Sequence, residues 1–272
     1  YTCKTQEEYL YAISNYSGHV SVMAQEITDG IDVCVQGWFN GDNWVEPFTY
    51  VLEERRFLDG DRGANTICMG AVVVPANRDG SLVGLLKRLT PFLNKIGYAG
   101  PIDLYFIVSG TDPVVWAITA RFSYDALEAF VGLMDEDVGE FLYDVAIGKR
   151  EHVTLSDDFG MAVRLTLPPY PSPINSETHG RPLPNNLQND EHFLLADCYK
   201  SRIMQTGGKG LFWAASSGVL AKAIGHGRSI KGLRENIYER ISKVDIQDLQ
   251  YRKDIGLRVG KDLKRLRKLG IV

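Results

Sequence analysis

Apolar and polar residues alternate over residues 31–39, where Val33 and Val35 share one face. A period of two is typical of a β-strand. The turn sequence Asn-Gly-Asp-Asn at 40–43 follows directly and leads into a second apolar strand. The pattern therefore predicts an antiparallel hairpin over 31–52.

The same periodicities predict the other elements. Further strands are expected at 20–27, 102–109, 114–122, 160–167 and 210–220, with 102–109 and 114–122 forming a second hairpin. Helices are expected at 5–16, 81–96, 125–147 and 229–244. Pro47 requires an edge or a bulge in its strand, since proline lacks the N–H of a sheet ladder. Thr5 and Ser229 are expected N-caps, and Pro91 an expected helix kink. Hairpins mixed with helices indicate an α+β fold with mixed or antiparallel sheets.

Composition narrows the classes of protein. The 272 residues are 44% hydrophobic and include 30 basic and 34 acidic side chains, which excludes a disordered chain and gives no basic surplus for nucleic acid. No apolar run reaches membrane-spanning length, and four scattered cysteines suit a reducing, cytoplasmic compartment. The basic tail 252–268 is interpreted as a solvated helix face. A start at Tyr1 rather than Met predicts a fragment or a trimmed chain.

Candidate chemistry concentrates in one loop. The five histidines form no metal-binding motif, and hydrolase-elbow, Walker and Rossmann motifs are absent from the sequence. The loop 59–66 is acidic and glycine-containing, but Ala64 and Gly70 stand where a calcium loop needs Gly and Glu. Two interpretations stay open: a solvated turn, or a loop that holds an anionic, amine-bearing ligand.

Residues 53–71 read E-E-R-R-F-L-D-G-D-R-G-A-N-T-I-C-M-G-A. This string resembles D-H-K-R-x-x-D-G-D-x-G-P-N-T-G-G-M-G-A, the substrate loop of the phosphoribosylamine–glycine ligase family in the ATP-grasp superfamily. Segments 22–35, 118–130 and 251–256 are similar to further family motifs in the same order. The resemblance implies an ATP-grasp fold and a ligase that activates glycine with magnesium and ATP for attack by phosphoribosylamine.

The resemblance also implies roles for individual residues. The expected nucleotide-binding residues are Gln25, Glu26 and Asp32. The expected substrate-binding residues are Arg55, Arg56, Asp59, Asp61, Asn65, Thr66 and Met69. Arg121 matches an arginine that would stabilise the transferring phosphate, and Arg121 and Asp61 are the expected catalytic residues. We expect Asp61, Asn65 and Arg121 to line one cleft.

Departures from the family pattern leave activity open. Ala117 and Thr119 stand at the family's magnesium positions, so no metal ligand is assigned. Residues 1–150 are expected to form the C-terminal part of an ATP-grasp domain and 151–272 a C-terminal lobe with a long loop at 168–190. Within the latter, residues 200–256 are expected to form a separate small lobe. Alternatives to the purine-synthesis ligase are a ligase for a different amine and a catalytically silent relative acting as a binding or scaffold protein. The expected partners are small molecules, with neither nucleic acid nor membrane, and the oligomeric state is open.

Overall fold

The computed structural model describes residues 3–15, 23–172, 180–202, 208–214 and 217–272. The strands are β1 Ile31–Asn40, β2 Trp44–Arg56, β3 Asn65–Pro75, β4 Ala99–Val108, β5 Val114–Thr119, β6 Phe159–Thr166, β7 Phe193–Leu195, β8 Cys198–Arg202, β9 Lys209–Trp213 and β10 Val219–Gly227. The helices are α1 Gln6–Asn15, α2 Ser81–Lys87, α3 Thr90–Ile96, α4 Asp125–Val131, α5 Val138–Ala146, α6 Asn185–Asn189, α7 Ile230–Ser242 and α8 Val259–Lys268, with a 3₁₀ turn, η1, at Asp59–Asp61.

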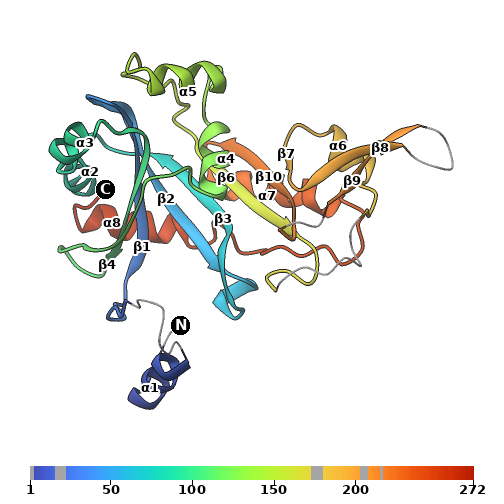
Figure 1. Ribbon diagram of the computed structural model, residues 1–272, viewed down its shortest axis with the longest axis horizontal. Coiled ribbons are helices and arrows are strands. Elements are labelled where there is room, and N and C mark those ends of the chain that lie inside the picture. The colour runs from blue at the N-terminus through green and yellow to red at the C-terminus, as the bar shows by residue number, and fades with distance from the viewer. Residues whose placement is uncertain (1–2, 16–22, 173–179, 203–207, 215–216) are drawn as a thin grey trace.

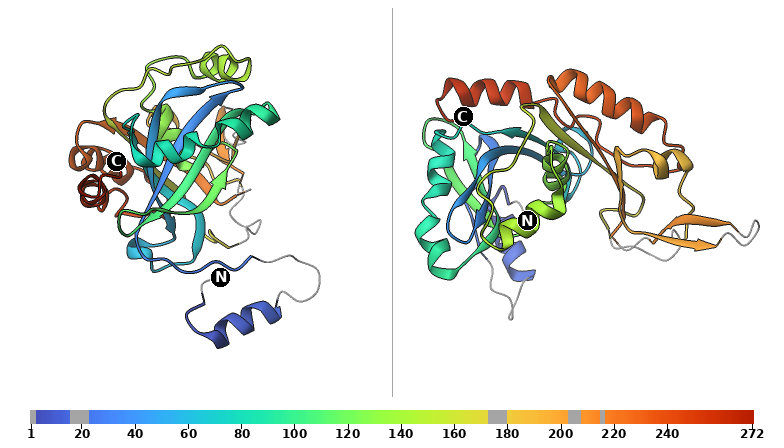
Figure 2. Two further views of the ribbon diagram at one scale, coloured as in Figure 1. Left: turned by 90° about the vertical axis from the view of Figure 1, so that its left-hand side faces the viewer. Right: turned by 90° about the horizontal axis from the view of Figure 1, so that it is seen from above.

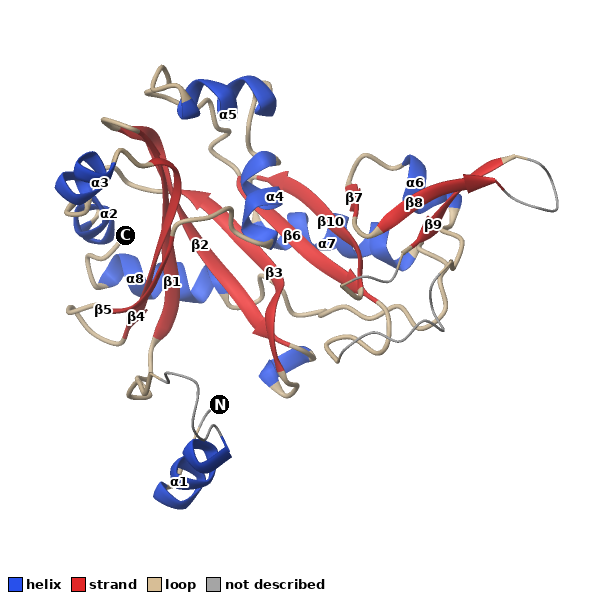
Figure 3. Cartoon of the chain, viewed as in Figure 1, coloured by secondary structure: helices blue, strands red, loops and turns tan. Residues whose placement is uncertain are grey.

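Within the described residues, eight strands form one antiparallel sheet in the order β5-β4-β1-β2-β3-β6-β10-β7 (Figures 1 and 3). Helices α2, α3, α7 and α8 supply core residues to one face, and α4 and α5 supply them to the other. The alternation in β1 explains this arrangement, because Val33 and Val35 enter the first core while Cys34 and Trp38 enter the second. Because both faces of the sheet are covered, the polar residues that a ligand can reach are expected where its strands begin and end.

Both predicted hairpins are confirmed: β1 pairs with β2 and β4 with β5, all antiparallel in the same sheet. Pro47 lies in a bulge, since between the pairs Gln36–Thr49 and Trp38–Val45 one residue of β1, Gly37, faces three of β2, residues 46–48. The helix expected at 81–96 divides into α2 and α3 just before Pro91. Ser229 caps α7 by accepting a hydrogen bond from the Gly232 backbone N–H at 3.2 Å.

Two strand predictions were wrong. Residues 23–27 form no strand, and residues 20–22 of that prediction lie outside the described residues. The strand expected at 210–220 is β9 and the start of β10, which belong to different sheets; residues 215–216 of it are not described. The reason is Gly218, whose φ of +81° turns the chain before β10 pairs with β6.

The sheet continues across the boundary expected at residue 150, because β3 pairs with β6. Residues 200–256 are therefore not a wholly separate lobe, since β10 is a strand of the main sheet. The β8–β9 hairpin projects away from it (Figures 1 and 2). The loop expected at 168–190, of which 173–179 are not described, contains α6 and adds Leu183 and Leu187 to the core. Among the described helices, none has the length and apolarity needed to span a membrane.

Candidate functional site

A pocket of about 430 Å³ lies where β1 begins, β2 ends and α8 begins. It unites five residues that the sequence singled out, namely Asp32, Arg55, Arg56, Asp61 and Asn65. The remaining polar lining comes from β2 and α8: Glu53, Glu54, Arg258, Asp262 and Arg265. We call this the mixed-charge pocket, because it presents carboxylates and guanidinium groups within one hollow.

Arg55 is the centre of an ion-pair and aromatic cluster beside this pocket. Its guanidinium pairs with the Asp32 carboxylate and, at 2.8 Å, with Glu53. It also lies 5.0 Å from the ring centroids of both Tyr105 and Trp116. Burial alone would lower the pKa of Arg55, but Asp32 and Glu53 outweigh that effect and raise it. Arg55 is therefore a fixed cation rather than a proton donor.

Burial dominates the acid–base behaviour of the two glutamates at the end of β2. Burial raises the pKa of Glu53 to about 7, although the neighbouring Arg55 opposes the shift. Burial also raises the pKa of Glu54. Arg258 opposes this shift, because it forms a bidentate ion pair with the Glu54 carboxylate. Glu53 is thus a carboxyl group that changes its charge near neutral pH.

The loop that contains η1 is bound to the C-terminal segment. Asp61 accepts a hydrogen bond from Arg252 Nη1 at 2.6 Å, and Asp59 accepts one from the Lys253 backbone N–H at 2.7 Å. Asp254 accepts one from the Gly60 backbone N–H at 2.8 Å. The carboxylates of the expected substrate loop are therefore already engaged within the chain.

Other predicted residues are distributed around the pocket. Gln25 donates a hydrogen bond from Nε2 to the Trp116 carbonyl at 3.0 Å, and Glu26 is exposed next to it in sequence. Thr66 donates its hydroxyl to the Arg55 carbonyl at 2.6 Å, so it fixes the loop base. Met69 is completely buried and contributes packing.

Arg121 does not line the mixed-charge pocket. Its guanidinium donates to the carbonyl of Phe122 at 2.9 Å and lies 4.3 Å from the Tyr124 ring centroid. The structure therefore brings Asp61 and Asn65 together and leaves Arg121 on its own exposed loop after β5.

A buried polar network lies at the open end of the β4–β5 hairpin, away from the turn at 109–113. Asp103 is 1% exposed and accepts hydrogen bonds from Ser123 Oγ at 2.7 Å, Gln36 Nε2 at 3.2 Å and Thr119 Oγ1 at 3.3 Å. Asp103 stands directly opposite Thr119 in the strand register. The Thr119 hydroxyl is thereby directed to a carboxylate of its own chain, and Ala117 offers no side-chain oxygen.

Asp125 is the first residue of α4, which follows β5 in the chain, and it is fully buried. Arg164 binds it in a bidentate manner, with Nε at 3.0 Å and Nη2 at 2.5 Å from Oδ1. Glu128, one turn later in α4, pairs with Lys222. Both carboxylates are thus paired with a cation, although Glu128 Oε2 has no hydrogen-bond partner. In the described part of the chain no group of three or more His, Cys, Asp or Glu side chains is placed to hold a metal ion.

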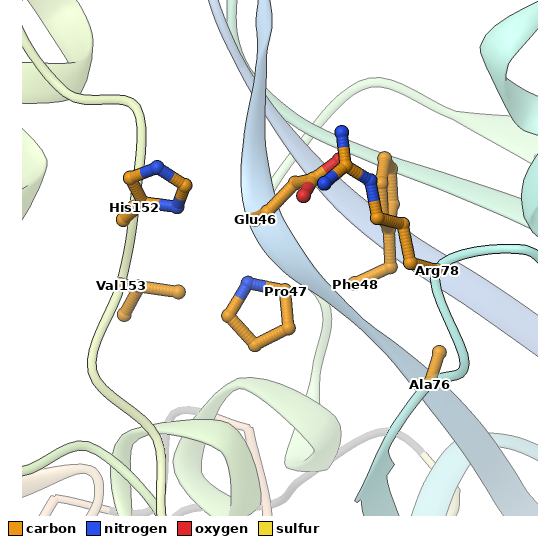
Figure 4. Close-up of a pocket in the computed structure, with 7 residues that line it drawn as sticks. All are labelled: Glu46, Pro47, Phe48, Ala76, Arg78, His152 and Val153. Atoms are coloured by element: carbon orange, nitrogen blue, oxygen red, sulfur yellow. The ribbon is translucent and has the colours of Figure 1, made fainter.

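A second hollow, of about 260 Å³, lies at the other end of β2 (Figure 4). Glu46 accepts from Arg78 at 3.2 Å and Lys87 at 3.4 Å, while His152 and Val153 stand on a neighbouring segment. None of the residues that the sequence singled out for chemistry lines it. The candidate functional site is therefore the mixed-charge pocket.

Sequence reasoning missed the contribution of α8. Arg258 and Arg265 face the mixed-charge pocket, whereas the basic tail was interpreted as a solvated helix face. The available signal was position, because α8 follows directly on the Y-R-K-D-I-G segment at 251–256. Because Arg252 and Lys253 bind the substrate loop, the helix that follows them, α8, lies beside the same pocket.

The chain has the fold of ATP-grasp proteins, as expected from the sequence. In particular, the chain resembles phosphoribosylamine–glycine ligases. One from Streptococcus pyogenes is 24% identical over 242 residues, covering 86% of this chain and 55% of the relative. The solved phosphoribosylamine–glycine ligase from Thermotoga maritima superposes with a TM-score of 0.67 at 23% identity, covering 85% and 56% of the two chains.

The similarity extends more weakly to other enzymes of this fold. A biotin carboxylase–beta-gamma-ATP complex from Campylobacter jejuni superposes with a TM-score of 0.50 at 12% identity, covering 90% of this chain and 52% of the other. No family model matches the chain. The chain spans slightly more than half the length of the curated relatives named above.

Proposed function

We propose that this chain forms the amine-substrate side of an ATP-dependent carboxylate–amine ligase. In the reaction that its relatives' name describes, phosphoribosylamine is joined to glycine. The observation that carries the proposal is the mixed-charge pocket, which gathers the substrate loop, the start of β1 and α8. Its carboxylates suit an amine and its guanidinium groups suit a phosphate.

Two arginines of the pocket are assigned to the phosphate. Arg55 and Arg258 are held by acidic neighbours, but Arg56 and Arg265 form no ion pair with any described residue. Both are exposed, and each already donates one hydrogen bond to a backbone carbonyl, of Gly63 and Ser109 respectively. A guanidinium group anchored in this way keeps N–H donors for an anionic ligand.

Nucleotide binding is assigned to Gln25, Glu26 and Asp32. Gln25 and Asp32 both contact Trp116, the first through the backbone carbonyl and the second through the indole N–H at 3.4 Å. ATP, when bound, would supply the phosphate that activates the carboxylate substrate. Arg121 is assigned to the charge of the transferring phosphate, although it stands apart from the pocket.

Ala117 and Thr119, near the end of β5, do not fit magnesium, which prefers carboxylate and other hard oxygen ligands. Ala117 supplies no oxygen, and the Thr119 hydroxyl is directed to Asp103. We propose that the magnesium ligands of the resembled ligases are lost here, and no step of the reaction is assigned to a metal. The two parts of the chain, residues 1–150 and 151–272, share the main sheet, and we propose a cytoplasmic location.

The pocket assignment is tested with ribose 5-phosphate, which carries the phosphate without the reactive amine. Calorimetry of the chain should detect binding, and Arg265→Gln should weaken it about tenfold through loss of one charge-assisted contact. Lys264→Gln, which removes an exposed charge from the same helix outside the pocket, is the matched control. Equal affinities of the two variants, or no binding by the unmodified chain, would contradict the proposal.

A further inference from the structure

We propose that Arg252 is a positioning residue that fastens the substrate loop to the C-terminal segment. With Lys253 and Asp254 it forms what we call the 252–254 clamp. The part of this inference that concerns substrate affinity rests on the proposed function. The clamp assigns Asp59 and Asp61 to loop positioning, where the resemblance had assigned them to substrate contact.

The clamp connects residues far apart in sequence through side chains and backbone. Arg252 donates Nη1 to both the Asp61 carboxylate at 2.6 Å and the Arg56 carbonyl at 2.9 Å. Asp254 receives the Gly60 backbone N–H across a separation of 194 residues. Asp59 receives the Lys253 backbone N–H across the same separation. Each of the three clamp residues thus holds a different part of the loop.

Burial and charge show that Arg252 has no capacity left for a ligand. It is 1% exposed, and Asp254 takes its Nε and Nη2 at 2.7 Å each. Glu54 adds a third carboxylate at 3.4 Å. Burial alone would lower the pKa of Arg252, but these acidic neighbours raise it, so the cation is permanent. A buried charge compensated on every side holds its neighbours in place.

The loop needs external support because its backbone is strained. Leu58 and Asp61 have φ angles of 70° and 57°, in the left-handed region that non-glycine residues rarely adopt. Such conformations persist only where surrounding contacts over-determine them. The clamp acts between these two positions, at Asp59 and Gly60, and on Asp61 itself.

The clamp transmits this order to the mixed-charge pocket. Arg56 and Asn65 are paired in the β2–β3 register at the base of the loop, and both line the pocket. Because Arg252 binds the Arg56 carbonyl, release of the clamp frees the base that carries both side chains. Loss of Arg252 should therefore loosen the loop and weaken phosphate binding together.

Limited trypsin digestion measures the loop directly, since Arg62 is exposed within it. Arg252→Gln should accelerate cleavage after Arg62 about tenfold or more and leave cleavage after exposed Lys200, in β8, unchanged. The same variant should bind ribose 5-phosphate about tenfold more weakly, and Arg252→Lys should restore part of both properties. Arg240→Gln, which removes a partly exposed ion pair with Asp190, is the matched control.

If Arg252→Gln does not fold, Asp59→Ala decides the question, because it removes only the acceptor of the Lys253 N–H. Faster cleavage after Arg62 in that variant supports the clamp, and an unchanged rate overturns it. An unchanged rate in folded Arg252→Gln overturns it as well. Failure of the unmodified chain to bind ribose 5-phosphate refutes the proposed function, while the cleavage rates still decide the clamp.

Discussion

The substrate loop and the open end of the β4–β5 hairpin stabilise buried carboxylates in opposite ways. At the loop, carboxylates meet arginines from a segment nearly two hundred residues later, as in the pair Asp61–Arg252. At the open end of the hairpin, the buried Asp103 carboxylate accepts hydrogen bonds from the neutral donors of Ser123, Gln36 and Thr119. Ion pairs join distant parts of the chain, whereas the hydroxyl and amide network consolidates one end of the sheet. The mixed-charge pocket keeps Arg56 and Arg265 available to an anionic ligand, whereas the polar side chains at the open end of the hairpin bond one another.

The largest effect is expected at the buried ion pair between Asp125 in α4 and Arg164 in β6. Asp125→Ala leaves the Arg164 guanidinium buried without its carboxylate, which should cost about 3–5 kcal/mol in the free energy of unfolding. Urea titration followed by circular dichroism measures this change. Glu239→Ala, which breaks an exposed pair with Lys243, should cost less than about 1 kcal/mol. Similar costs for both variants would show that the Asp125–Arg164 pair contributes no more than a surface pair.

Glu53 predicts a pH dependence at the charged end. Its pKa is raised from 4.5 to about 7 in the folded chain, so the folded protein keeps a proton that the unfolded chain has lost between these values. Stability should therefore be highest below pH 4.5 with respect to this group and fall as the pH rises to 7, by up to about 3 kcal/mol.

The measurement is the difference in unfolding free energy between pH 5 and pH 8, which should shrink in Glu53→Gln. Glu151→Gln, an exposed glutamate, should leave the difference unchanged. A pH dependence that survives Glu53→Gln intact would remove Glu53 as its source.

Magnesium binding tests the open end of the β4–β5 hairpin, where Asp103 has neutral hydrogen-bond donors. Calorimetry of magnesium-ATP with the unmodified chain should detect weak binding or none. Ala117→Glu combined with Thr119→Asn should improve magnesium-dependent binding, by on the order of 1–3 kcal/mol for one or two charge-assisted contacts. Tight magnesium-ATP binding by the unmodified chain would refute the loss of ligands. Because Asp125 and Glu128 are held by Arg164 and Lys222, they are not expected to compensate.

The smallest effect is expected from one hydroxyl of the network. Ser123→Ala removes the shortest of the three contacts just described to Asp103 and should cost about 1 kcal/mol in unfolding free energy. Ser242→Ala in α7 removes an exposed hydroxyl that bonds the Glu239 carbonyl, and should cost less. A Ser123→Ala variant as stable as the unmodified chain would mean that Asp103 does not depend on that donor.

Local patterns predicted much of the fold. The alternation of β1, the turn at 40–43 and the Ser229 cap depend on neighbours within a few residues, so the sequence carries them directly. The pairing of β10 with β6 was missed because Gly218 and the preceding residues hide the start of β10 inside an apolar run. Strand partners chosen across long separations leave no periodic signal.

The candidate site shows the same limit. Motif resemblance located Asp32, Arg55, Arg56, Asp61 and Asn65, which the fold gathers into one pocket. It could not show that Arg252 binds the Asp61 carboxylate or that Met69 is buried, because both depend on tertiary packing. Nor could it show that Thr119 faces Asp103, since that follows from the register of two strands.

The separation between the loop and its clamp also has a consequence in time. Residues 59–61 leave the ribosome about 190 residues before their partners at 252–254. At typical elongation rates that interval lasts roughly 10 to 40 seconds. The strands of the sheet can begin to pair before the strained loop has formed its hydrogen bonds to residues 252–254. Completion of the pocket is therefore expected only after the strands that precede residue 252 have begun to pair.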